Sequence, residues 1–390
     1  MKKFFSILLC VNIFLNITML SFADDILEED INYPVYLKKA NNIPNVEAQS
    51  AIVIDSKTGR VLYEKNAYQK RPMASTTKIM TAIVALENGN LDDDVKISKR
   101  ASSIGGSVIK LRENEIYKLE DLLYGLLMKS GNDSAIAIAE HIGGNVQSFV
   151  EMMNKKAVEL NAKDTHFINP HGLDKDMHYT TAYDLANIAC YAMQNATFSK
   201  IVSTKTKTIR DGKCFNNTNE LLYLYDGCNG VKTGFTNKAG RCLVTSVKRG
   251  DDSYISVVLG CETKNKRAQS SKEILDYAYQ NYKRYELINK DELYTMIDVL
   301  KGKKNDIAIY PEDTIKLPLN QDEYQNIKIN CNIDYKKLAP IKKGQNMGYV
   351  EFLVGDKIIA KTQFVTRYAV ERKEFADYLK DLLVYLVTKI

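Results

Sequence analysis

The sequence predicts an α+β protein in which helices are grouped around an antiparallel sheet, followed by a small all-β domain and a terminal amphipathic helix. Strand-like runs near the start and at residues 232–260 enclose a series of apolar helical runs. After about residue 290 apolar and polar residues alternate, which is typical of antiparallel strands. Residues 371–390 carry an apolar stripe at helical spacing. A chain of 390 residues has material for two or three domains.

The first residues read as a secretory signal peptide. Two lysines precede an apolar stretch from Phe4 to Leu20, and small residues end at Ala23. The alternative is a retained membrane anchor, for which the stretch is short and interrupted by asparagines. We therefore expect residues 1–23 to be removed, residues 24–44 to form a leader, and the mature protein to be exported and extracytoplasmic.

The charge of the chain argues against a nucleic-acid partner. The formal net charge is +6, and it falls to +4 without the first 23 residues, which hold Lys2 and Lys3 and no acid. Such a mild and interspersed balance does not form a phosphate-binding surface, although it suits an anionic cell surface. We expect no nucleic-acid partner.

The cysteines and histidines do not predict a metal site. Six cysteines follow residue 23 without a C-x-x-C pair, and the four histidines form no H-E-x-x-H motif. We expect no metal and no cofactor. The runs Cys242–Val247 and Tyr254–Leu259 predict a strand hairpin that brings Cys242 near Cys261, a candidate disulfide that a chain of this size does not need.

The first domain, residues 45–285, begins with a hairpin. Ala51–Asp55 and Val61–Glu64 read as its strands, and Ser56–Gly59 reads as its turn. Apolar spacing predicts helices over the following ranges: 75–89, 119–128, 133–142, 146–160, 182–193 and 271–282. Ser130 to Asn132 therefore lie in a tight connection between two buried helices, where polar side chains are held rigidly.

The second domain, residues 290–370, is predicted to be a small β-sandwich-like unit. Residues 327–334 alternate between apolar and polar side chains. Val350–Val354 joins Ile358–Thr362 through a turn that contains Gly355, which predicts a second hairpin.

Residues 371–390 are predicted to form an amphipathic helix that associates with a membrane surface. The apolar stripe consists of Phe375, Leu379, Leu382, Leu383, Leu386 and Ile390. The segment is too short and too charged to span a bilayer. The alternative is a final core helix that docks on the β domain.

Ser75 and Lys78 stand three residues apart where an apolar helical run begins. On a helix this spacing places both side chains on one face, one turn apart. A serine hydroxyl needs a neighbour that takes its proton during attack. A lysine is such a base only if burial or a second cation lowers its pKa. A helix start also offers free backbone N–H groups to a developing oxyanion.

Two similar triplets occur elsewhere, and their context argues against a catalytic role. Ser107 and Lys110 lie in a strand-like run, where a spacing of three points side chains to opposite faces. Lys57–Gly59 reads as a turn whose glycine supplies backbone freedom.

Three triplets in order carry the resemblance to a known family. They are Ser75-x-x-Lys78, Ser130-x-Asn132 and Lys232-Thr233-Gly234. By this set the chain resembles low-molecular-mass penicillin-binding proteins, which are serine D-alanyl-D-alanine carboxypeptidases. Gly131 stands where the family pattern has Asp. The resemblance runs from about residue 45 to the C-terminus, and it implies a β-lactamase/transpeptidase-like fold for the first domain.

The resemblance also implies roles for individual residues. Ser75 would attack the carbonyl between the two terminal D-alanines of a peptidoglycan stem peptide, with Lys78 as its base. Ser130 would bridge the two lysines and pass a proton to the departing amine. The substrate-binding residues would be Asn132, Lys232, Thr233, Gly234 and Phe235, and the backbone N–H groups of Ser75 and Phe235 would form the oxyanion hole. β-Lactams would acylate Ser75 and leave an ester that hydrolyses slowly.

Rival functions make different demands on the sequence. A β-lactamase should carry a carboxylate that activates water, and the loop His166–Leu173 has no Glu. A transpeptidase needs a second peptide as acceptor, which the sequence neither shows nor forbids. A β-lactam sensor should have transmembrane helices, and none is visible after residue 23. A wall-binding scaffold that had lost activity should have lost Ser75, Lys78 or Lys232, and all three are present. His171 is expected to structure its loop.

Overall fold

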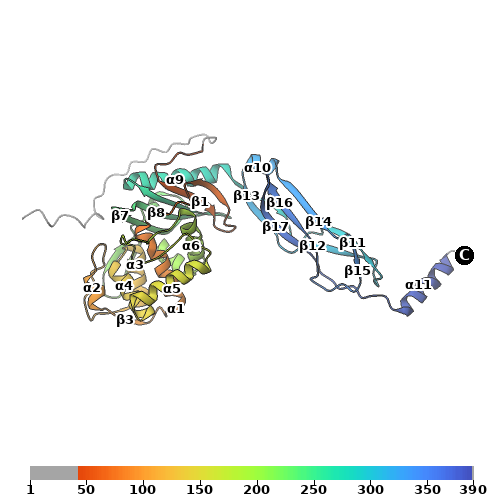
Figure 1. Cartoon of the computed structure of the whole chain (residues 1–390), viewed down its shortest axis with the longest axis horizontal. Helices are drawn as coiled ribbons and strands as arrows, with labels where there is room; N and C mark the ends of the chain where they lie inside the picture. The colour runs from red at the N-terminus through yellow and green to blue at the C-terminus, as the bar shows by residue number, and fades with distance from the viewer. Residues whose placement is uncertain (1–42, 389–390) are drawn as a thin grey trace, which may run out of the picture. The chain divides into compact units, whose positions relative to one another are not determined.

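The structure is a computed structural model that describes residues 43–388. The predicted signal peptide and nearly all of the predicted leader lie outside the described residues. The chain divides into two compact units, the first ending at Ala278 and the second beginning at Tyr279 (Figure 1). No helix between residues 43 and 388 is long and apolar enough to cross a membrane.

The first unit is built on a five-stranded antiparallel sheet with the order β2-β1-β9-β8-β7. Its strands are β1 (Ser50–Asp55), β2 (Val61–Lys65), β7 (Cys228–Thr236), β8 (Gly240–Arg249) and β9 (Asp252–Cys261). Residues from both ends of the domain pair in it, for example Ile52 with Val257. The predicted α+β fold, with a sheet made from two distant parts of the domain, is confirmed.

Helices cover both faces of this sheet. On one face Ser271 of α9 (Lys264–Asn281) has its Oγ 3.0 Å from Thr245 Oγ1 and 2.8 Å from Ser256 Oγ. The other large helices lie on the opposite side (Figure 1). They are α1 (Lys78–Asn88), α3 (Leu119–Met128), α4 (Asn132–Gly143), α5 (Val146–Glu159), α6 (Ala182–Gln194) and α7 (Ala196–Ser203). Because both faces are covered, the side chains of the central strands are buried along most of their length.

Several short elements have no signal in the sequence. Apart from the 3₁₀ turn η1 (Ala74–Thr77), which overlaps the helix predicted from residue 75, they are β3 (Asp94–Lys96), β4 (Ile116–Lys118), α2 (Lys99–Ser103), β5 (Thr206–Thr208), β6 (Cys214–Asn216) and α8 (Leu221–Leu224). Each is too short for a period to be read. Helix α9 begins seven residues before the predicted start at residue 271, in a polar stretch without apolar spacing.

Two predictions about this unit are wrong. Residues 104–115 form a loop and not strand-like pieces, because the Asp133 carboxylate accepts the N–H groups of Ile109 and Leu111 that a strand partner would need. The hairpin of β8 and β9 is present, yet Cys242 and Cys261 are both free thiols.

The second unit is β-rich. A six-stranded sheet has the order β14-β16-β17-β12-β11-β15, and β10 pairs with β13. The strands are β10 (Lys283–Ile288), β11 (Thr295–Leu300), β12 (Asp306–Pro311), β13 (Ile315–Leu319), β14 (Lys328–Ile333), β15 (Lys336–Leu338), β16 (Asn346–Val354) and β17 (Lys357–Thr366). The predicted hairpin of β16 and β17 is confirmed, with Val350 opposite Thr362. Only β11 and β15 pair in parallel among the described strands. The short helix α10 (Gln321–Gln325) starts with a capping box.

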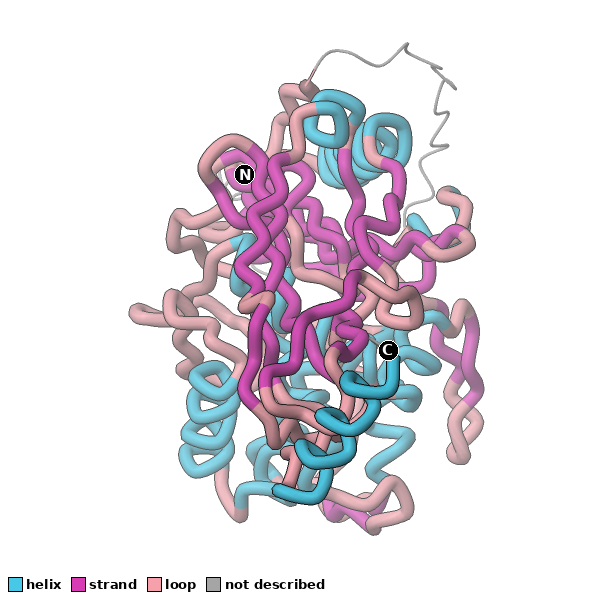
Figure 2. Tube along the Cα trace, turned by 90° about the vertical axis from the view of Figure 1, so that its right-hand side faces the viewer, coloured by secondary structure: helices cyan, strands magenta, loops and turns pink. Residues whose placement is uncertain are grey.

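Helix α11 (Phe375–Thr388) ends the described chain and is cyan beside the letter C in Figure 2. None of its side chains is buried, and Phe375 is 83% exposed. The docked arrangement that we considered as an alternative is therefore not seen in residues 375–388. Ile390 of the predicted stripe lies outside the described residues.

Candidate active site

Ser75 lies on a strained turn that leads into α1. The residue before it, Ala74, has a φ of +48°, a conformation that residues other than glycine rarely adopt. Ser75 belongs to η1, and α1 begins only at Lys78. The tighter turn still brings the pair together, since Lys78 Nζ lies 2.9 Å from Ser75 Oγ. Ser75 is half-buried and Lys78 is completely buried.

The surroundings of Lys78 favour its neutral form. Burial lowers its pKa well below the usual value, and the positive charge of Lys232 lowers it further, while Asp133 opposes the shift. Lys78 Nζ also donates to Asn132 Oδ1 at 2.8 Å and to the carbonyl oxygen of His171 at 2.6 Å. A neutral amine has two N–H groups and one lone pair. When both N–H groups serve these acceptors, the lone pair is left for the Ser75 hydroxyl, as a general base requires.

The connection between α3 and α4 contributes Ser130 and Asn132. Ser130 has a φ of +61°, and its buried Oγ has no hydrogen-bond partner within residues 43–388. The predicted bridge from Ser130 to both lysines is therefore not formed in the described part of the chain. Asn132 Oδ1 accepts from Lys78, and its Nδ2 donates to Gly105 O at 2.7 Å. One N–H of that amide remains for another acceptor.

Strand β7 forms the other wall of the site. Lys232 is 1% exposed, and Thr233 Oγ1 lies 2.9 Å from Thr218 Oγ1. At Gly234 the strand comes so close to the turn that a Cβ atom would lie 3.1 Å from Ser75 N. Only glycine allows this approach without displacing the turn. Phe235 is exposed, with the Arg241 guanidinium 3.8 Å above the centre of its ring.

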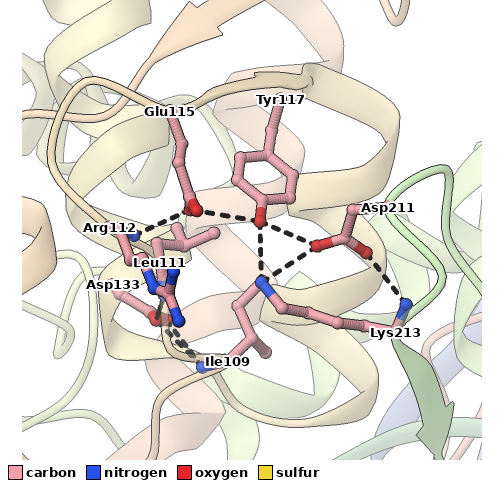
Figure 3. Close-up of polar contacts among 8 residues, drawn as sticks. All are labelled: Ile109, Leu111, Arg112, Glu115, Tyr117, Asp133, Asp211 and Lys213. Atoms are coloured by element: carbon pink, nitrogen blue, oxygen red, sulfur yellow. Dashed lines mark hydrogen bonds and ion pairs between the residues drawn. The ribbon is translucent and has the colours of Figure 1, made fainter.

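The loop opposite β7 is held by a buried carboxylate. Asp133 accepts from the N–H groups of Ile109 and Leu111 at 2.9 and 3.1 Å, as Figure 3 shows. The same loop accepts the N–H of Asn132 at the carbonyl oxygen of Ser107, at 2.7 Å. Asp133 thus fixes the segment against which Asn132 is placed.

A polar cluster beyond this loop joins two hairpins. Tyr117 Oη lies 2.8 Å from Asp211 and 2.7 Å from Lys213 Nζ, and Glu115 is the third neighbour (Figure 3). Burial is the main reason that the pKa of Tyr117 rises to about 12. The cluster connects β4 to the β5–β6 hairpin, from which the chain continues to Thr218 and so to Thr233.

Sequence reasoning missed residues that support the site. Thr77 Oγ1 lies 2.8 Å from His178 Nε2, and elsewhere in the same unit Arg267 forms a partly buried ion pair with Glu220 at 2.6 Å. No spacing pattern connects any of these partners, which are at least 47 positions apart. His171, expected to structure its loop, accepts the Leu173 N–H at its Nδ1, and its carbonyl oxygen binds Lys78.

The structure brings parts of all three triplets together, since Lys78 contacts Ser75 and Asn132, and β7 approaches Ser75 at Gly234. A serine touches a lysine that is buried and next to a second lysine, and an edge strand approaches the serine N–H. This arrangement can perform nucleophilic attack on a carbonyl and stabilise the oxyanion that forms.

Family comparisons cover most of the chain. Residues 37–263 match the family described as D-alanyl-D-alanine carboxypeptidase. Residues 282–372 match the C-terminal domain of penicillin-binding protein 5.

Individual relatives cover both units. The D-alanyl-D-alanine carboxypeptidase DacF of Bacillus subtilis is 36% identical over 348 residues, which are 86% of this chain and 88% of the relative. DacD of Escherichia coli is 32% identical and covers 87% of this chain and 90% of its own. Among solved structures, penicillin-binding protein 5 from Haemophilus influenzae is 30% identical with a TM-score of 0.75, covering 85% of this chain and all of that one. A mutant of the Streptomyces K15 DD-transpeptidase is 35% identical with a TM-score of 0.58, covering 60% of this chain and 99% of its own.

Proposed function

The chain belongs to the D-alanyl-D-alanine carboxypeptidase family and is a serine-type D-Ala-D-Ala carboxypeptidase, in which we propose that Ser75 is the nucleophile and Lys78 the base. The observation that carries the proposal is the contact of 2.9 Å between Ser75 Oγ and the buried Nζ of Lys78. Burial and Lys232 keep that amine in the neutral form that accepts a proton.

The acylation step follows from these contacts. Ser75 Oγ attacks the carbonyl carbon of the penultimate D-alanine and passes its proton to Lys78 Nζ. The oxyanion is stabilised by the N–H groups of Ser75 and Phe235. When the intermediate collapses, the C–N bond breaks and the nitrogen of the terminal D-alanine takes up a proton through Ser130. Because the Ser130 hydroxyl has no partner within residues 43–388, it is available for this transfer.

The remaining residues hold the substrate. Lys232 and Thr233 bind the terminal carboxylate, and the free N–H of Asn132 donates to a peptide carbonyl. The acyl group then leaves Ser75 when water adds to the ester, and the proton returns to the serine. Ser75 attacks a β-lactam carbonyl in the same way, which explains why a carboxypeptidase of this kind also binds penicillin covalently.

A second acceptor is a specific alternative to water. The K15 protein, which is 35% identical over 265 residues, is described both as a DD-transpeptidase and as a D-alanyl-D-alanine carboxypeptidase. An amine in place of water would turn the same acyl-enzyme toward transfer, so the acceptor has to be measured.

The experiment is intact-mass spectrometry of the protein with benzylpenicillin, followed by an assay for D-alanine released from a pentapeptide that ends in D-Ala-D-Ala. We expect an adduct in the wild type and in Ser103→Ala, an exposed serine control, and none in Ser75→Ala. Release of D-alanine with the adduct supports hydrolysis. An adduct without release in the absence of an amine acceptor supports transfer, rapid penicillin turnover supports a β-lactamase, and an adduct in Ser75→Ala overturns the assignment.

We also propose that the enzyme is exported and is attached to the outer face of the cell membrane by α11. The apolar side chains of α11 are exposed, including Leu379, Leu382 and Leu386 at 48–54%. Since these side chains are half exposed, burying one contributes about half of the 1.5–3 kcal/mol of a fully exposed leucine, a gain that a lipid surface offers and water does not.

Vesicle cosedimentation tests the attachment. The full mature chain and a form that ends at residue 370 are compared on vesicles that contain one third anionic lipid. We expect only the full chain to sediment, and Lys380→Gln, on the polar side, to sediment with it. A truncated form that still binds would contradict the proposal.

A further inference from the structure

A buried chain of hydrogen bonds lies behind the nucleophile. The backbone N–H of Ile168 donates to His178 Nδ1 at 3.0 Å, so this nitrogen carries no proton. The proton of the neutral ring is then on Nε2, which lies 2.8 Å from Thr77 Oγ1. The Thr77 hydroxyl in turn donates to the carbonyl oxygen of Ala74 at 2.8 Å. The direction of every hydrogen bond in the chain is therefore fixed.

This chain is shielded from water. His178 is 5% exposed, and Thr77 and Ala74 are 1% exposed. The ring of Phe167 lies 6.0 Å from that of His178 in an edge-on contact. Burial is the main cause that lowers the pKa of His178 to about 4, and His166 and Lys78 lower it further. The imidazole is therefore neutral near neutral pH, as its two hydrogen bonds require.

The end of the chain at Ala74 matters because of peptide geometry. The carbonyl of Ala74 and the N–H of Ser75 belong to one planar trans peptide group, so they point in opposite directions. Holding the carbonyl oxygen on one side therefore aims the Ser75 N–H at the other. Strand β7 comes close to this N–H group, since a Cβ on Gly234 would lie 3.1 Å from Ser75 N.

The Ala74 peptide needs such support. Its φ of +48° costs roughly 1–2 kcal/mol for a residue with a side chain. A second restraint comes from Gly172, whose backbone packs so closely that a Cβ would lie 1.9 Å from the Ala74 carbonyl oxygen. The carbonyl is thus held between the Gly172 backbone and the Thr77 hydroxyl.

We propose that His178 is a positioning residue for the oxyanion hole: through Thr77 it fixes the plane of the Ala74–Ser75 peptide, so that the Ser75 N–H points to where the oxyanion forms. His178 touches neither substrate nor reacting atoms. The inference rests on the proposed role of Ser75 as nucleophile.

The expected signature is a loss in the chemical step and not in binding. An oxyanion donor acts on charge that develops only in the transition state, and removing one costs about 10²–10³-fold in kcat. A variant in which the donor is present but misdirected should lose less in kcat than one that lacks the donor. We expect acylation by benzylpenicillin to slow about 10- to 100-fold, with the Kd of the non-covalent complex changed by less than about threefold.

Two substitutions separate the two hydrogen bonds of His178. In His178→Gln the amide nitrogen can replace Nε2 and donate to Thr77. In His178→Asn the amide oxygen can replace Nδ1 and accept from Ile168, but no donor reaches Thr77. We expect Gln to acylate within about fivefold of the wild type and Asn to show the full loss. His166→Asn is the matched control, because His166 is a partly exposed histidine of the same segment, bonded through Nδ1 to the carbonyl oxygen of Met177.

Stopped-flow measurement of acylation against penicillin concentration separates the Kd from the acylation rate constant. A wild-type enzyme that forms no Ser75 adduct would refute the proposed function itself. If the wild type is acylated and His178→Asn keeps its rate constant, the positioning role is refuted. Equal loss in Gln and Asn, or a loss confined to the Kd, also refutes it. Should His178→Asn fail to fold, Thr77→Val decides, since it removes the link and keeps the imidazole; an unchanged rate constant there overturns the proposal.

Discussion

Substituting Gly172 by alanine should displace the turn that carries Ser75 and so slow acylation. Gly172 has a φ of +92°, and a Cβ there would lie 1.9 Å from the carbonyl oxygen of Ala74 and 2.9 Å from Ser75 N. Even close C–H···O contacts keep carbon and oxygen about 3.3 Å apart, so the two backbones must separate by roughly 1.4 Å. Both atoms that meet the new methyl group are backbone atoms, which cannot yield by changing a rotamer.

The displacement should reach the chemistry by two routes. It moves the peptide that carries the Ser75 N–H, and it moves His171, whose carbonyl oxygen lies 2.6 Å from Lys78 Nζ. A misplacement of about 1 Å costs on the order of 10²-fold in rate. The unfavourable φ and the overpacking together should lower the free energy of unfolding by roughly 2–5 kcal/mol.

Gly212→Ala is the matched control for backbone strain. Gly212 has a φ of +85°, and no atom lies within 4 Å of its would-be Cβ. This variant should lose about 1–2 kcal/mol of stability from the φ alone and keep its acylation rate. The assay is benzylpenicillin acylation followed by intact mass, with urea unfolding of both variants. A Gly172→Ala enzyme that is acylated within about threefold of Gly212→Ala would refute the reasoning.

Two further predictions concern pH. Burial lowers the pKa of His171 to about 3 and of His178 to about 4, so protons bind the unfolded chain near pH 6.5 but not the native one. The free energy of unfolding should have its full value above pH 6.5 and decrease toward pH 4 by up to about 3 kcal/mol per histidine. Urea unfolding at several pH values should show a smaller decrease in His178→Gln than in the wild type. Equal decreases in the two proteins would contradict this prediction. Burial is the main cause that lowers the pKa of Lys78, and the charge of Lys232 is the second, so Lys232→Met should raise that pKa. The acylation rate should then begin to fall at a higher pH, on the acid side, than in the wild type or in the exposed control Lys238→Met. A pH–rate profile that does not move would count against a neutral Lys78.

Local sequence determined the elements and the identity of the reacting groups. The spacing of Ser75 and Lys78 places them one turn apart whether that turn is 3₁₀ or α-helical, and the structure has them in contact. The strands β1, β8 and β9 can be predicted from their residue types and from the spacing of their apolar residues, because both are properties of the local sequence.

Register lay beyond what the sequence alone predicts. The hairpin of β8 and β9 is correct, but Cys261 lies opposite Arg241, and the register shifts between Arg241 and Leu243. An even ladder that continued the pairing of Leu243 with Val258 would put Cys242 opposite Leu259, so neither register pairs the two thiols, and both are free.

The support of the nucleophile was decided only by the tertiary structure. Thr77 and His178 are 101 positions apart, and Gly172 meets Ala74 through backbone atoms alone. Periodicity reports which side chains share a face of one element, and it carries no information on which buried donor from elsewhere will meet a given carbonyl. That pairing depends on how the elements pack, because a buried polar group must find its partner wherever the fold brings one.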